Sequence, residues 1–365
     1  MNLVIAGGGS GGHLYPGIAL AETFLRHEPS CRILFVGTRW GMERRLIPAK
    51  GFALATISAA GFVGGGWMKK ARALLLIPVG LFQSIAILRR FSPHMVLGVG
   101  GYASGPVLLA AILLGIKRAL LEPNAVPGMA NRWLAPYADL VITAFEETCQ
   151  KQRVRKVLRL GVPIRPHLTE GDFSTPSFEG TLTLLVMGGS QGAHQINQAM
   201  QKAVPILKEA GMAMNIIHQT GERDYKMVLE GYKTGSSSSS SRMSVQVVPF
   251  IDNIAEVYAV AHLVLCRAGA ITVAELTAIG KPAILVPFPH AEGHQERNAA
   301  AVVSGGGAEM ILDRDLSGSR LAERLIALLS DRPYLQKMGA AAKQSGHPHA
   351  AQEIVKACYQ LVGLK

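Results

Sequence analysis

A histidine and a glutamate each stand near the start of a predicted helix that follows a glycine-containing turn. His13 follows the glycine run at 7–12, and Glu275 follows the turn at 267–270 (RAGA). Backbone N–H groups at a helix start have no partner within the helix, so they can hold a phosphate or a diphosphate. A histidine there can exchange protons with a ligand, and a carboxylate can accept hydrogen bonds from ribose hydroxyls. Ordinary surface side chains are the alternative for both residues.

Local signals predict the elements around Glu275. Residues 263–266 are apolar and predict a short buried strand, and residues 271–279 have apolar positions at helical spacing. Gly280 stands where a helix commonly ends in a glycine, and residues 283–286 predict the next buried strand. This order places Glu275 about one turn below the open end of the helix.

The N-terminal stretch repeats the pattern. Residues 3–6 predict a strand, and the glycines at 7–12 match the G-x-G-x-x-G spacing of dinucleotide-binding loops. Such loops are normally paired with an acidic residue at the tip of the second strand. Here that strand is predicted at 32–36, and its tip at 37–40 (GTRW) contains no acid. Arg39 could hold a 2′-phosphate, so an NADP-dependent oxidoreductase is one alternative.

Strands and helices alternate along the chain, which predicts an α/β protein with doubly wound parallel sheets. Further strands are predicted at 95–99 and 119–122, and a glycine loop follows the first of them at 100–105. A second strand with a glycine loop occurs at 183–192, after a Pro-, Ser- and Thr-rich link near 161–180. Two nucleotide-binding-type domains in tandem are therefore expected, with ligands at the carboxyl ends of their strands.

The composition favours an anionic partner. The 365 residues carry a formal net charge of +12, and 49% of them are hydrophobic. A positive balance attracts phosphates, acidic lipid head groups or nucleic acids. The cations cluster with apolar residues and not with stacking aromatic residues, so no nucleic acid partner is expected. Four cysteines without paired spacing predict reduced, buried thiols, and no signal peptide is recognised.

Residues 64–91 combine cations with a long apolar run and contain no acidic residue. The uncharged part, 73–88, is shorter than the roughly 20 apolar residues that a membrane-spanning helix needs. We therefore expect a helix partly buried in the core, whose exposed part around Trp67 and Met68 lies on an anionic membrane surface.

Two patterns that suggest metal binding are rejected. Asp313 and Asp315 form a D-x-D pair, but they precede a predicted helix and fit turn and N-cap roles. His290 and His294 lack the H-E-x-x-H order and flank a glycine, so they fit a polar loop that presents side chains to a ligand. The sequence predicts neither a metal ion nor a cofactor.

Seven motifs together resemble the MurG family, the undecaprenyldiphospho-muramoylpentapeptide β-N-acetylglucosaminyltransferases. Each motif alone has low specificity, but their order and spacing over nearly the whole chain are highly specific. The motifs are GGGSGGHLYPGIALA (7–21), GVGGYASGP (98–106), GVPIR (161–165), GGSQGAHQIN (188–197), PFID (249–252), CRAGAITVAE (266–275) and HQERNA (294–299).

The resemblance implies the GT-B fold, in which two Rossmann-like, doubly wound α/β domains enclose a deep cleft. Residues 1–163, completed by a C-terminal helix at 347–365, would form the acceptor- and membrane-side domain, and residues 164–346 the UDP-sugar-binding domain. The implied activity is an inverting transfer of GlcNAc from UDP-GlcNAc to the C4 hydroxyl of undecaprenyl-diphospho-MurNAc-pentapeptide (lipid I to lipid II). A peripheral enzyme of peptidoglycan synthesis on the cytoplasmic face of the bacterial inner membrane is expected, with other cell-wall synthesis proteins as candidate partners.

The family pattern also implies roles for individual residues. It places the uracil near Ile251, the ribose on Glu275 and the sugar hydroxyls on Gln295. The implied donor-binding positions are Ser10, Gly11, Gly12, Asn124, Arg165, Ser190, Ile251, Ala270, Ile271, Thr272, Val273, Ala274, Glu275 and Gln295. The implied acceptor diphosphate positions are Gly100, Gly101, Tyr102 and Ser104. His13 is the candidate general base, and helix-end amides with cations would hold the departing UDP without a metal.

Two positions depart from the family pattern. Residues 121–124 read LEPN where the family usually has HEQN, so a catalytic role of that family histidine does not carry over. Val162 replaces an asparagine within 161–165. Another GT-B transferase with a different lipid or small-molecule acceptor is the second alternative, and the loop at 98–106 argues against it.

Overall fold

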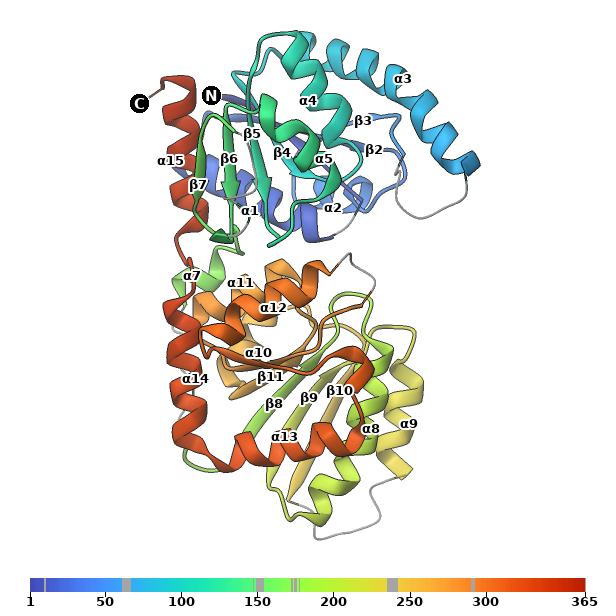
Figure 1. Ribbon diagram of the computed structural model, residues 1–365, viewed down its shortest axis with the longest axis vertical. Coiled ribbons are helices and arrows are strands. Elements are labelled where there is room, and N and C mark those ends of the chain that lie inside the picture. The colour runs from blue at the N-terminus through green and yellow to red at the C-terminus, as the bar shows by residue number, and fades with distance from the viewer. Residues whose placement is uncertain are drawn as a thin grey trace. The chain divides into compact units, whose positions relative to one another are not determined.

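The chain divides into two compact units, which Figure 1 shows as ribbons. Unit 1 comprises Met1–Pro166 and Pro348–Lys365, and unit 2 comprises His167–His347. The computed structural model describes residues 1–9, 11–60, 67–146, 148, 154–171, 173, 176, 178–234, 242–289 and 293–364, with the backbone alone for 67–75. The predicted site residue Ser10 and the loop residues His290 and Glu292 lie outside the described residues.

Unit 1 contains one seven-stranded parallel sheet with the strand order β3-β2-β1-β4-β5-β6-β7. Its strands are β1 (Asn2–Gly7), β2 (Arg32–Thr38), β3 (Ala53–Ile57), β4 (Met95–Gly100), β5 (Lys117–Glu122), β6 (Leu140–Thr143) and β7 (Val157–Arg159). Its helices are α1 (Gly11–His27), α2 (Glu43–Ala49), α3 (Trp67–Phe91), α4 (Ser104–Leu113), α5 (Met129–Leu134), the 3₁₀ turn η1 (Ala135–Tyr137) and α15 (Ala350–Val362).

Alternation along the strands builds a core on each face of this sheet. Leu3 and Ile5 of β1 pack in one cluster with side chains of α1 and α15. Val4 and Ala6 pack in the other cluster, with side chains of α4 and with Leu88 of α3. Because successive strand residues point to opposite faces, a continuous apolar strand is buried on both sides. This is the arrangement of a doubly wound α/β fold.

Unit 2 repeats the topology with a six-stranded parallel sheet in the order β10-β9-β8-β11-β12-β13. Its strands are β8 (Leu182–Met187), β9 (Met214–Gln219), β10 (Met243–Val248), β11 (Leu263–Cys266), β12 (Ala283–Leu285) and β13 (Ala308–Met310). Its helices are α7 (His167–Glu170), α8 (His194–Glu209), α9 (Tyr225–Thr234), α10 (Ile254–Val260), α11 (Ala270–Ile279), α12 (His294–Ser304), η2 (Asp313–Asp315), α13 (Gly318–Ser330) and α14 (Arg332–Gln344).

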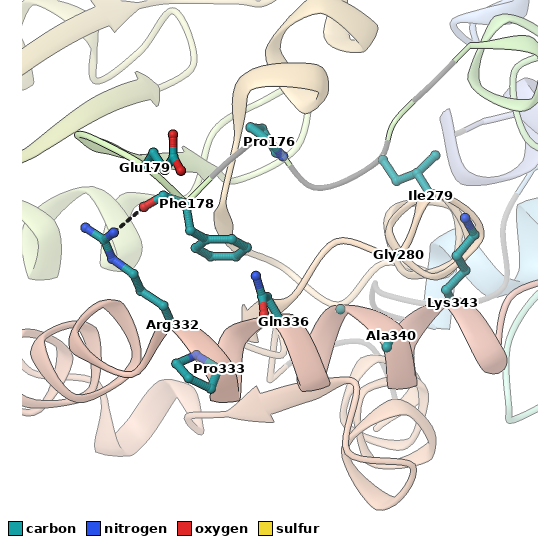
Figure 2. A pocket seen from close by; sticks show the side chains of 11 residues that line it. Pro176, Phe178, Glu179, Ile279, Gly280, Arg332, Pro333, Gln336, Ala340 and Lys343 are labelled. Carbon is teal, nitrogen blue, oxygen red and sulfur yellow. Dashed lines mark hydrogen bonds between the residues drawn. The ribbon is translucent and has the colours of Figure 1, made fainter.

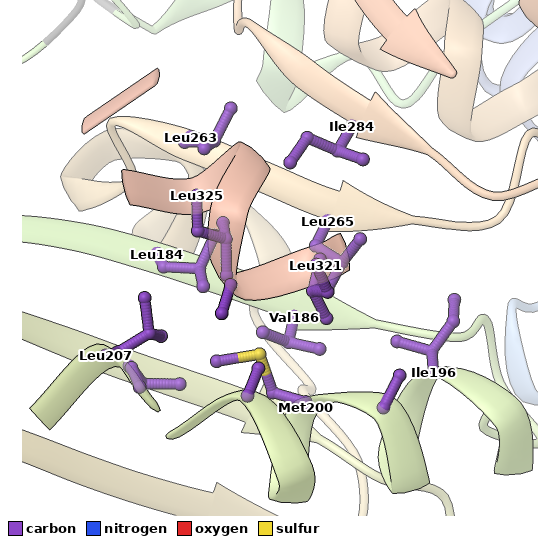
Figure 3. Packing of buried hydrophobic residues seen from close by; sticks show 14 of the residues in the cluster. Leu184, Val186, Ile196, Met200, Leu207, Leu263, Leu265, Ile284, Leu321 and Leu325 are labelled. Carbon is purple, nitrogen blue, oxygen red and sulfur yellow. The ribbon is translucent and has the colours of Figure 1, made fainter. Parts of the chain in front are cut away.

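Helices α8 and α13 cover one face of the unit 2 sheet. Figure 3 shows Met200 of α8 and Leu325 of α13 packed against Leu184 and Val186 of β8. Leu263 and the other labelled side chains of the strands extend the same buried cluster. In both units the sheet order places the first strand between the second and the fourth, so each has the switch point at which doubly wound sheets bind ligands. The predicted α/β fold with two Rossmann-like domains is confirmed.

Local predictions agree closely with the observed elements. The strand predicted at 263–266 is β11, and the helix predicted at 271–279 is α11, which begins one residue earlier. Gly280 has the left-handed conformation (φ +71°) that was predicted for the end of this helix. Cys31, Cys266 and Cys358 are buried and free, which confirms the predicted thiols for the described cysteines.

The apolar segment at 67–91 forms the single helix α3. Among the helices within the described residues, none is long and apolar enough to cross a membrane. From residue 76 onward, Gly80, Ser84 and Leu88 are buried, whereas Val79 and Phe82 are exposed. The helix therefore packs on the sheet with one face and leaves apolar side chains on the other.

Candidate functional site

Two glycine loops meet at the carboxyl ends of β1 and β4 in unit 1. The backbone N–H of Gly8 donates to the carbonyl oxygen of Gly100 over 3.3 Å. Gly101 has φ +84°, and a Cβ there would overlap the carbonyl oxygen of Gly8. Glycine alone suits this conformation and this close approach. The loops after the two strands are therefore held side by side at the switch point of the sheet.

His13 lies in the first turn of α1, against these loops. Its Nδ1 lies 3.1 Å from the carbonyl oxygen of Val99. Because a carbonyl oxygen can only accept, Nδ1 carries the hydrogen of the neutral ring and Nε2 carries the lone pair. A Cβ built on Gly100 would collide with the same imidazole. The ring thus packs on bare backbone, in the tautomer that a base acting through Nε2 requires.

The loop after β4 contains one exposed and one buried predicted site residue. Tyr102 is 49% exposed, and a Cβ built on Gly9 would touch its ring. Ser104 is fully buried, and its hydroxyl donates to the carbonyl oxygen of Ala6 over 2.6 Å. The same hydroxyl accepts from the N–H of Gly100 over 3.1 Å. Ser104 therefore holds the loop from beneath, and a contact with a diphosphate would require this network to open.

A buried carboxylate that the sequence did not single out orients Asn124. Glu122 ends β5, and its side chain accepts from the N–H and Nδ2 of Asn124 over 3.1 and 3.3 Å. It also accepts from the N–H of Gly128 over 2.8 Å and from Nδ2 of Asn131 over 2.9 Å. The segment after β5 is therefore folded around Glu122, which fixes the predicted donor contact Asn124.

The other predicted donor positions of unit 1 gather on the first turns of α1. Gly11 and Gly12 begin this helix, and Gly12 is exposed. The guanidinium of Arg165 lies 5.1 Å from the ring centroid of Tyr15, also on α1. This cation–π contact brings Arg165 to the helix that carries His13, although 152 sequence positions separate the two residues.

In unit 2, α11 begins directly after the turn that follows β11. Gly269 is its N-cap in an extended conformation, without a side-chain cap. The first helical bond runs from the N–H of Val273 to the carbonyl oxygen of Gly269 over 2.9 Å. The amides of Ala270, Ile271 and Thr272 therefore have no acceptor within the helix, which is the arrangement that binds anions. Ala274 follows on the same helix.

Glu275 is 4% exposed, and its Oε2 accepts a hydrogen bond from the hydroxyl of Tyr258 over 3.2 Å. Tyr258 belongs to α10 and is fully buried. A buried carboxylate needs such donors, since burial without them costs free energy. The sequence predicted Glu275 but gave no sign of its partner.

A cavity of about 590 Å³ opens between the glycine loop after β8, the turn before α11 and the start of α12. Of the predicted donor residues, Thr272 and Gln295 line it. Oε1 of Gln295 accepts from the N–H of Phe288 over 3.0 Å, which fixes the side chain. Ser190 is exposed on the glycine loop itself, and Ile251 is half-buried after β10. The structure thus groups these residues near one edge of the sheet, with Ile251 and Glu275 outside the cavity lining.

Arg267 lines the same cavity. Its Nη1 donates to the carbonyl oxygens of Val286 and Pro287, each over 3.2 Å, and pairs with the carboxylate of Asp313. The guanidinium also lies 5.5 Å from the ring centroid of Phe288. All three of these polar contacts are made by Nη1, whereas the buried Nε of Arg267 has no hydrogen-bond partner within the described residues.

The D-x-D pattern has a structural role in this region. Asp313 and Asp315 lie in the 3₁₀ turn η2, as the predicted turn role requires. The predicted N-cap role is wrong, because the cap of α13 is Ser317, whose hydroxyl oxygen accepts from the N–H of Arg320 over 3.2 Å. A serine nearer the helix start competes better for the free amides.

A histidine that the sequence passed over also lines the cavity. His194 is half-exposed, and its Nδ1 lies 2.8 Å from Oδ2 of Asp224. Nδ2 of Asn197 donates to the same carboxylate oxygen over 2.9 Å. Burial raises the pKa of the Asp224 carboxyl, but the hydrogen bonds from His194 and Asn197 outweigh it and keep that pKa below its usual value. The carboxylate of Asp224 thus joins two residues of α8, His194 in its first turn and Asn197.

A second cavity of unit 2, of about 680 Å³, contains none of the predicted site residues. Figure 2 shows it between the end of α11, the segment before β8 and α14, with Gln336 and Lys343 on its α14 side. The guanidinium of Arg332 donates to the carbonyl oxygen of Phe178 there. Its lining mixes cations with an acid, Glu179, and points to no particular ligand.

The two sheets with glycine loops at their switch points define a protein with tandem nucleotide-binding domains. Models of the glycosyltransferase family 28 N-terminal and C-terminal domains match residues 3–143 and 183–354. The chain therefore belongs to glycosyltransferase family 28. Within that family it is similar to MurG proteins. This confirms the resemblance that the seven motifs predicted.

Two curated relatives carry the name UDP-N-acetylglucosamine--N-acetylmuramyl-(pentapeptide) pyrophosphoryl-undecaprenol N-acetylglucosamine transferase. The protein of Syntrophus aciditrophicus is 43% identical over 365 residues, which is 100% of this chain and 99% of that protein. The protein of Thermodesulfovibrio yellowstonii is 43% identical over 371 residues and 100% of both chains.

Solved structures agree with the fold. The crystal structure of Acinetobacter baumannii MurG matches with a TM-score of 0.80 at 28% identity, covering 98% of this chain and 99% of that chain. A UDP-GlcNAc 2-epimerase of Neisseria meningitidis bound to UDP-GlcNAc matches with a TM-score of 0.68 at 14% identity, covering 99% and 100%. The second likeness shows a shared fold alone.

Proposed function

We propose that this protein transfers N-acetylglucosamine from UDP-GlcNAc to the C4 hydroxyl of undecaprenyl-diphospho-N-acetylmuramyl-pentapeptide. The observation that carries the proposal is the 43% identity, over the full chain, to transferases whose names state these substrates. The product is the lipid II precursor of peptidoglycan.

Unit 2 is the proposed donor site. The amides of Ala270, Ile271 and Thr272 are suited to the diphosphate, because they point out of the start of α11. Ser190 on the neighbouring glycine loop would add a hydroxyl to this contact. Glu275 would accept hydrogen bonds from the ribose hydroxyls, held in place by Tyr258.

The remaining donor contacts follow from position. Ile251 would contact the uracil, and Gln295, which lines the 590 Å³ cavity, would bind the sugar hydroxyls. In unit 1, the proposed donor contacts are Asn124, Arg165 and the amides at the start of α1. The half-buried setting of Ile251 suits a planar base, which is apolar on its faces.

Unit 1 is the proposed acceptor site, with His13 as general base. The C4 hydroxyl attacks the anomeric carbon, and the bond from that carbon to the diphosphate oxygen breaks in the same step. The hydroxyl proton passes to Nε2 of His13, where the neutral ring carries its lone pair. A single displacement inverts the configuration, and the amides of α11 stabilise the charge that develops on UDP.

The backbone of Gly100 and Gly101, with the exposed ring of Tyr102, is the proposed seat of the acceptor diphosphate. A glycine turn exposes amides to an anion, and a ring beside it limits the directions of approach. Ser104 would support this seat through its hydrogen bonds to Gly100. The acceptor lipid would then extend away from the loop.

Helices α3 and α4, which pack on each other, form the proposed contact with an anionic membrane surface. Phe82 and Val79 of α3 are 72% and 45% exposed, and Leu113 of α4 is 66% exposed. Arg89 and Arg90 lie exposed in the last turn of α3. Exposed apolar side chains with neighbouring cations favour the interface of an acidic bilayer. We propose that this surface holds the enzyme peripherally at the cytoplasmic face of the inner membrane, the location that the family resemblance implies.

The test is transfer of labelled GlcNAc from UDP-GlcNAc to a lipid-linked muramyl-pentapeptide in the presence of EDTA. Turnover that survives the chelator supports the donor, the acceptor and a reaction without a metal together. Binding of UDP-GlcNAc without transfer would keep the donor site and overturn the proposed acceptor. If neither binding nor transfer occurs, the proposed function is wrong.

A further inference from the structure

The carboxylate of Glu43, the first residue of α2, is buried beneath the glycine loop of unit 1. The residue is 0% exposed. Its Oε1 accepts from the N–H and the hydroxyl of Thr38, each over 2.7 Å, and its Oε2 accepts from the N–H of Gly9 over 3.0 Å. One side chain therefore joins the loop after β1 to the tip of β2.

Three glycines leave the space that this carboxylate fills. A Cβ built on Gly8, Gly37 or Gly41 would overlap side-chain atoms of Glu43. The chain thus wraps bare backbone around the carboxylate from three directions. Such a pocket accommodates one particular side chain, because any added methyl group displaces it.

The surroundings of the Glu43 carboxylate resemble those of a bound anion, because N–H and O–H groups donate to it. No ion pair with Glu43 is found within the part of the chain that the structure describes, so N–H and O–H groups alone compensate the charge. Burial raises the pKa of the Glu43 carboxyl, but the hydrogen bonds from Gly9 and Thr38 outweigh it and hold that pKa below its usual value. Glycine loops of dinucleotide-binding proteins direct such amides at a pyrophosphate. Here the amide of Gly9 is already engaged, which argues against the NADP alternative.

We propose that Glu43 is a positioning residue for the transfer reaction: it fixes the loop that leads into α1 and so sets His13 against the loop after β4. Few residues separate Glu43 from the base: Gly9, which donates to Glu43, stands four residues before His13. The N–H of Gly8, next to Gly9, donates to the carbonyl oxygen of Gly100 in the loop after β4. The inference rests on the proposed function, in which His13 and the loop after β4 handle the acceptor. Glu43 acts through these loops and does not touch the substrates.

The substitution Glu43→Gln tests this, because it preserves the volume and removes one acceptor. With one carboxamide oxygen and one NH₂ group, the side chain must turn a donor toward either Gly9 or Thr38. We expect the kcat/KM for the acceptor to fall by roughly tenfold or more, with a raised acceptor KM. The dissociation constant of UDP-GlcNAc should rise by a smaller factor than the acceptor KM, because the diphosphate, ribose and sugar contacts proposed for the donor lie in unit 2. Glu28→Gln is the matched control, since Glu28 is hydrogen-bonded to α15 in the same unit and touches neither loop.

A second readout does not depend on activity. Hydrogen exchange of the backbone amides in peptides that cover 7–14 and 98–104 should accelerate by about tenfold in Glu43→Gln and remain unchanged in Glu28→Gln. If Glu43→Gln does not accumulate in folded form, Gly41→Ala is measured instead, because its new Cβ displaces the carboxylate without removing its charge.

The outcomes are separable. Unchanged exchange in both peptides overturns the positioning role, even if the wild-type protein transfers no sugar and the proposed function fails. A fall in kcat with both KM values unchanged and with normal exchange also overturns it, because lost folded protein explains that result. An acceptor-specific defect with faster exchange in the two loops establishes it.

Discussion

Nδ1 of His13 lies 3.1 Å from the carbonyl oxygen of Val99, the last residue but one of β4. The contact joins the start of α1 to the neighbouring strand at the switch point of the unit 1 sheet. It fixes the hydrogen of the neutral imidazole on Nδ1, so a proton from the substrate can only go to Nε2. The alternative for His13 was an ordinary surface side chain at the start of the helix. Such a side chain would not need its ring to be held in this orientation.

Replacement of His13 by alanine should lower the turnover number by about 10²–10⁴-fold, because a positioned base contributes that much to proton transfer. The measurement is kcat for labelled GlcNAc transfer at saturating donor and acceptor. The affinity for UDP-GlcNAc should change little.

His94→Ala is the matched control for His13→Ala. His94 is exposed on the same unit, and its Nδ1 accepts from the N–H of Asn2 at the opposite end of β1. This variant should keep its full turnover. A loss of less than tenfold in folded His13→Ala would make His13 a binding residue and leave the base unassigned.

Replacement of Glu275 by alanine should raise the KM for UDP-GlcNAc. Each lost hydrogen bond between the carboxylate and a ribose hydroxyl is worth about 1.5–3 kcal/mol, which is roughly a tenfold to hundredfold change. Tyr258→Phe should raise the same KM by a smaller factor, because it removes only the hydroxyl that holds the carboxylate over 3.2 Å. Steady-state kinetics measures the KM of both variants, and calorimetric titration with UDP-GlcNAc measures their dissociation constants. Unchanged donor affinity in Glu275→Ala would exclude the ribose contact.

The sequence predicted the region from β11 to β12 almost residue by residue, because its signals are local. A short apolar run gives a buried strand, helical spacing gives α11, and a glycine with φ +71° ends it. The same local signals predicted the glycine loops that follow β1, β4 and β8. The candidate site could therefore be predicted in those parts that depend on local sequence patterns.

The supporting carboxylates could not be predicted. Glu43 meets Gly9 across 34 positions, and Asp224 meets His194 across 30. No spacing in the sequence marks these pairs, because the folding of the sheet alone brings them together. Asp313 was read as a turn and cap residue for the same reason, and its pairing with Arg267 became visible only in the fold.

Replacement of Asp313 by asparagine should lower the free energy of unfolding by about 1–3 kcal/mol. Both side chains of the pair are largely buried, so the guanidinium of Arg267 would lose its counter-charge in a poorly hydrated site. Asp315→Asn is the control on the same turn, because Asp315 is more exposed and lies 4.0 Å from Arg314. Denaturant unfolding measures both variants. If Asp313→Asn unfolds at the same denaturant concentration as the wild-type protein, the pair of Arg267 and Asp313 contributes no net stability.

Acid should weaken the attachment of α15 to α1 through Glu28. The Met1 amino group donates to Glu28 over 2.8 Å, and the hydroxyls of Tyr359 and Ser30 donate to the same carboxylate. These hydrogen bonds, led by that of the amino group, lower the pKa of Glu28 from 4.5 to about 2. Because the folded-state pKa is the lower one, the stabilisation is complete above pH 4.5 and is lost as the pH falls toward 2.

Thermal unfolding of the wild-type protein and of Glu28→Gln, measured from pH 7 to pH 2, tests this expectation. The carboxylate is partly solvated, so the difference in stability at pH 7 should be only about 1 kcal/mol, a shift of about 2–4 °C. The difference should shrink toward zero at the acid end, because the protonated glutamic acid and glutamine then carry the same charge. Glu22→Gln on α1, the helix that ends just before Glu28, is the control. Glu22 makes no hydrogen bond within the described residues, so its effect should not follow this profile. A difference that stays constant down to pH 2 would mean that the contact between Glu28 and Tyr359 stabilises the unit without its charge.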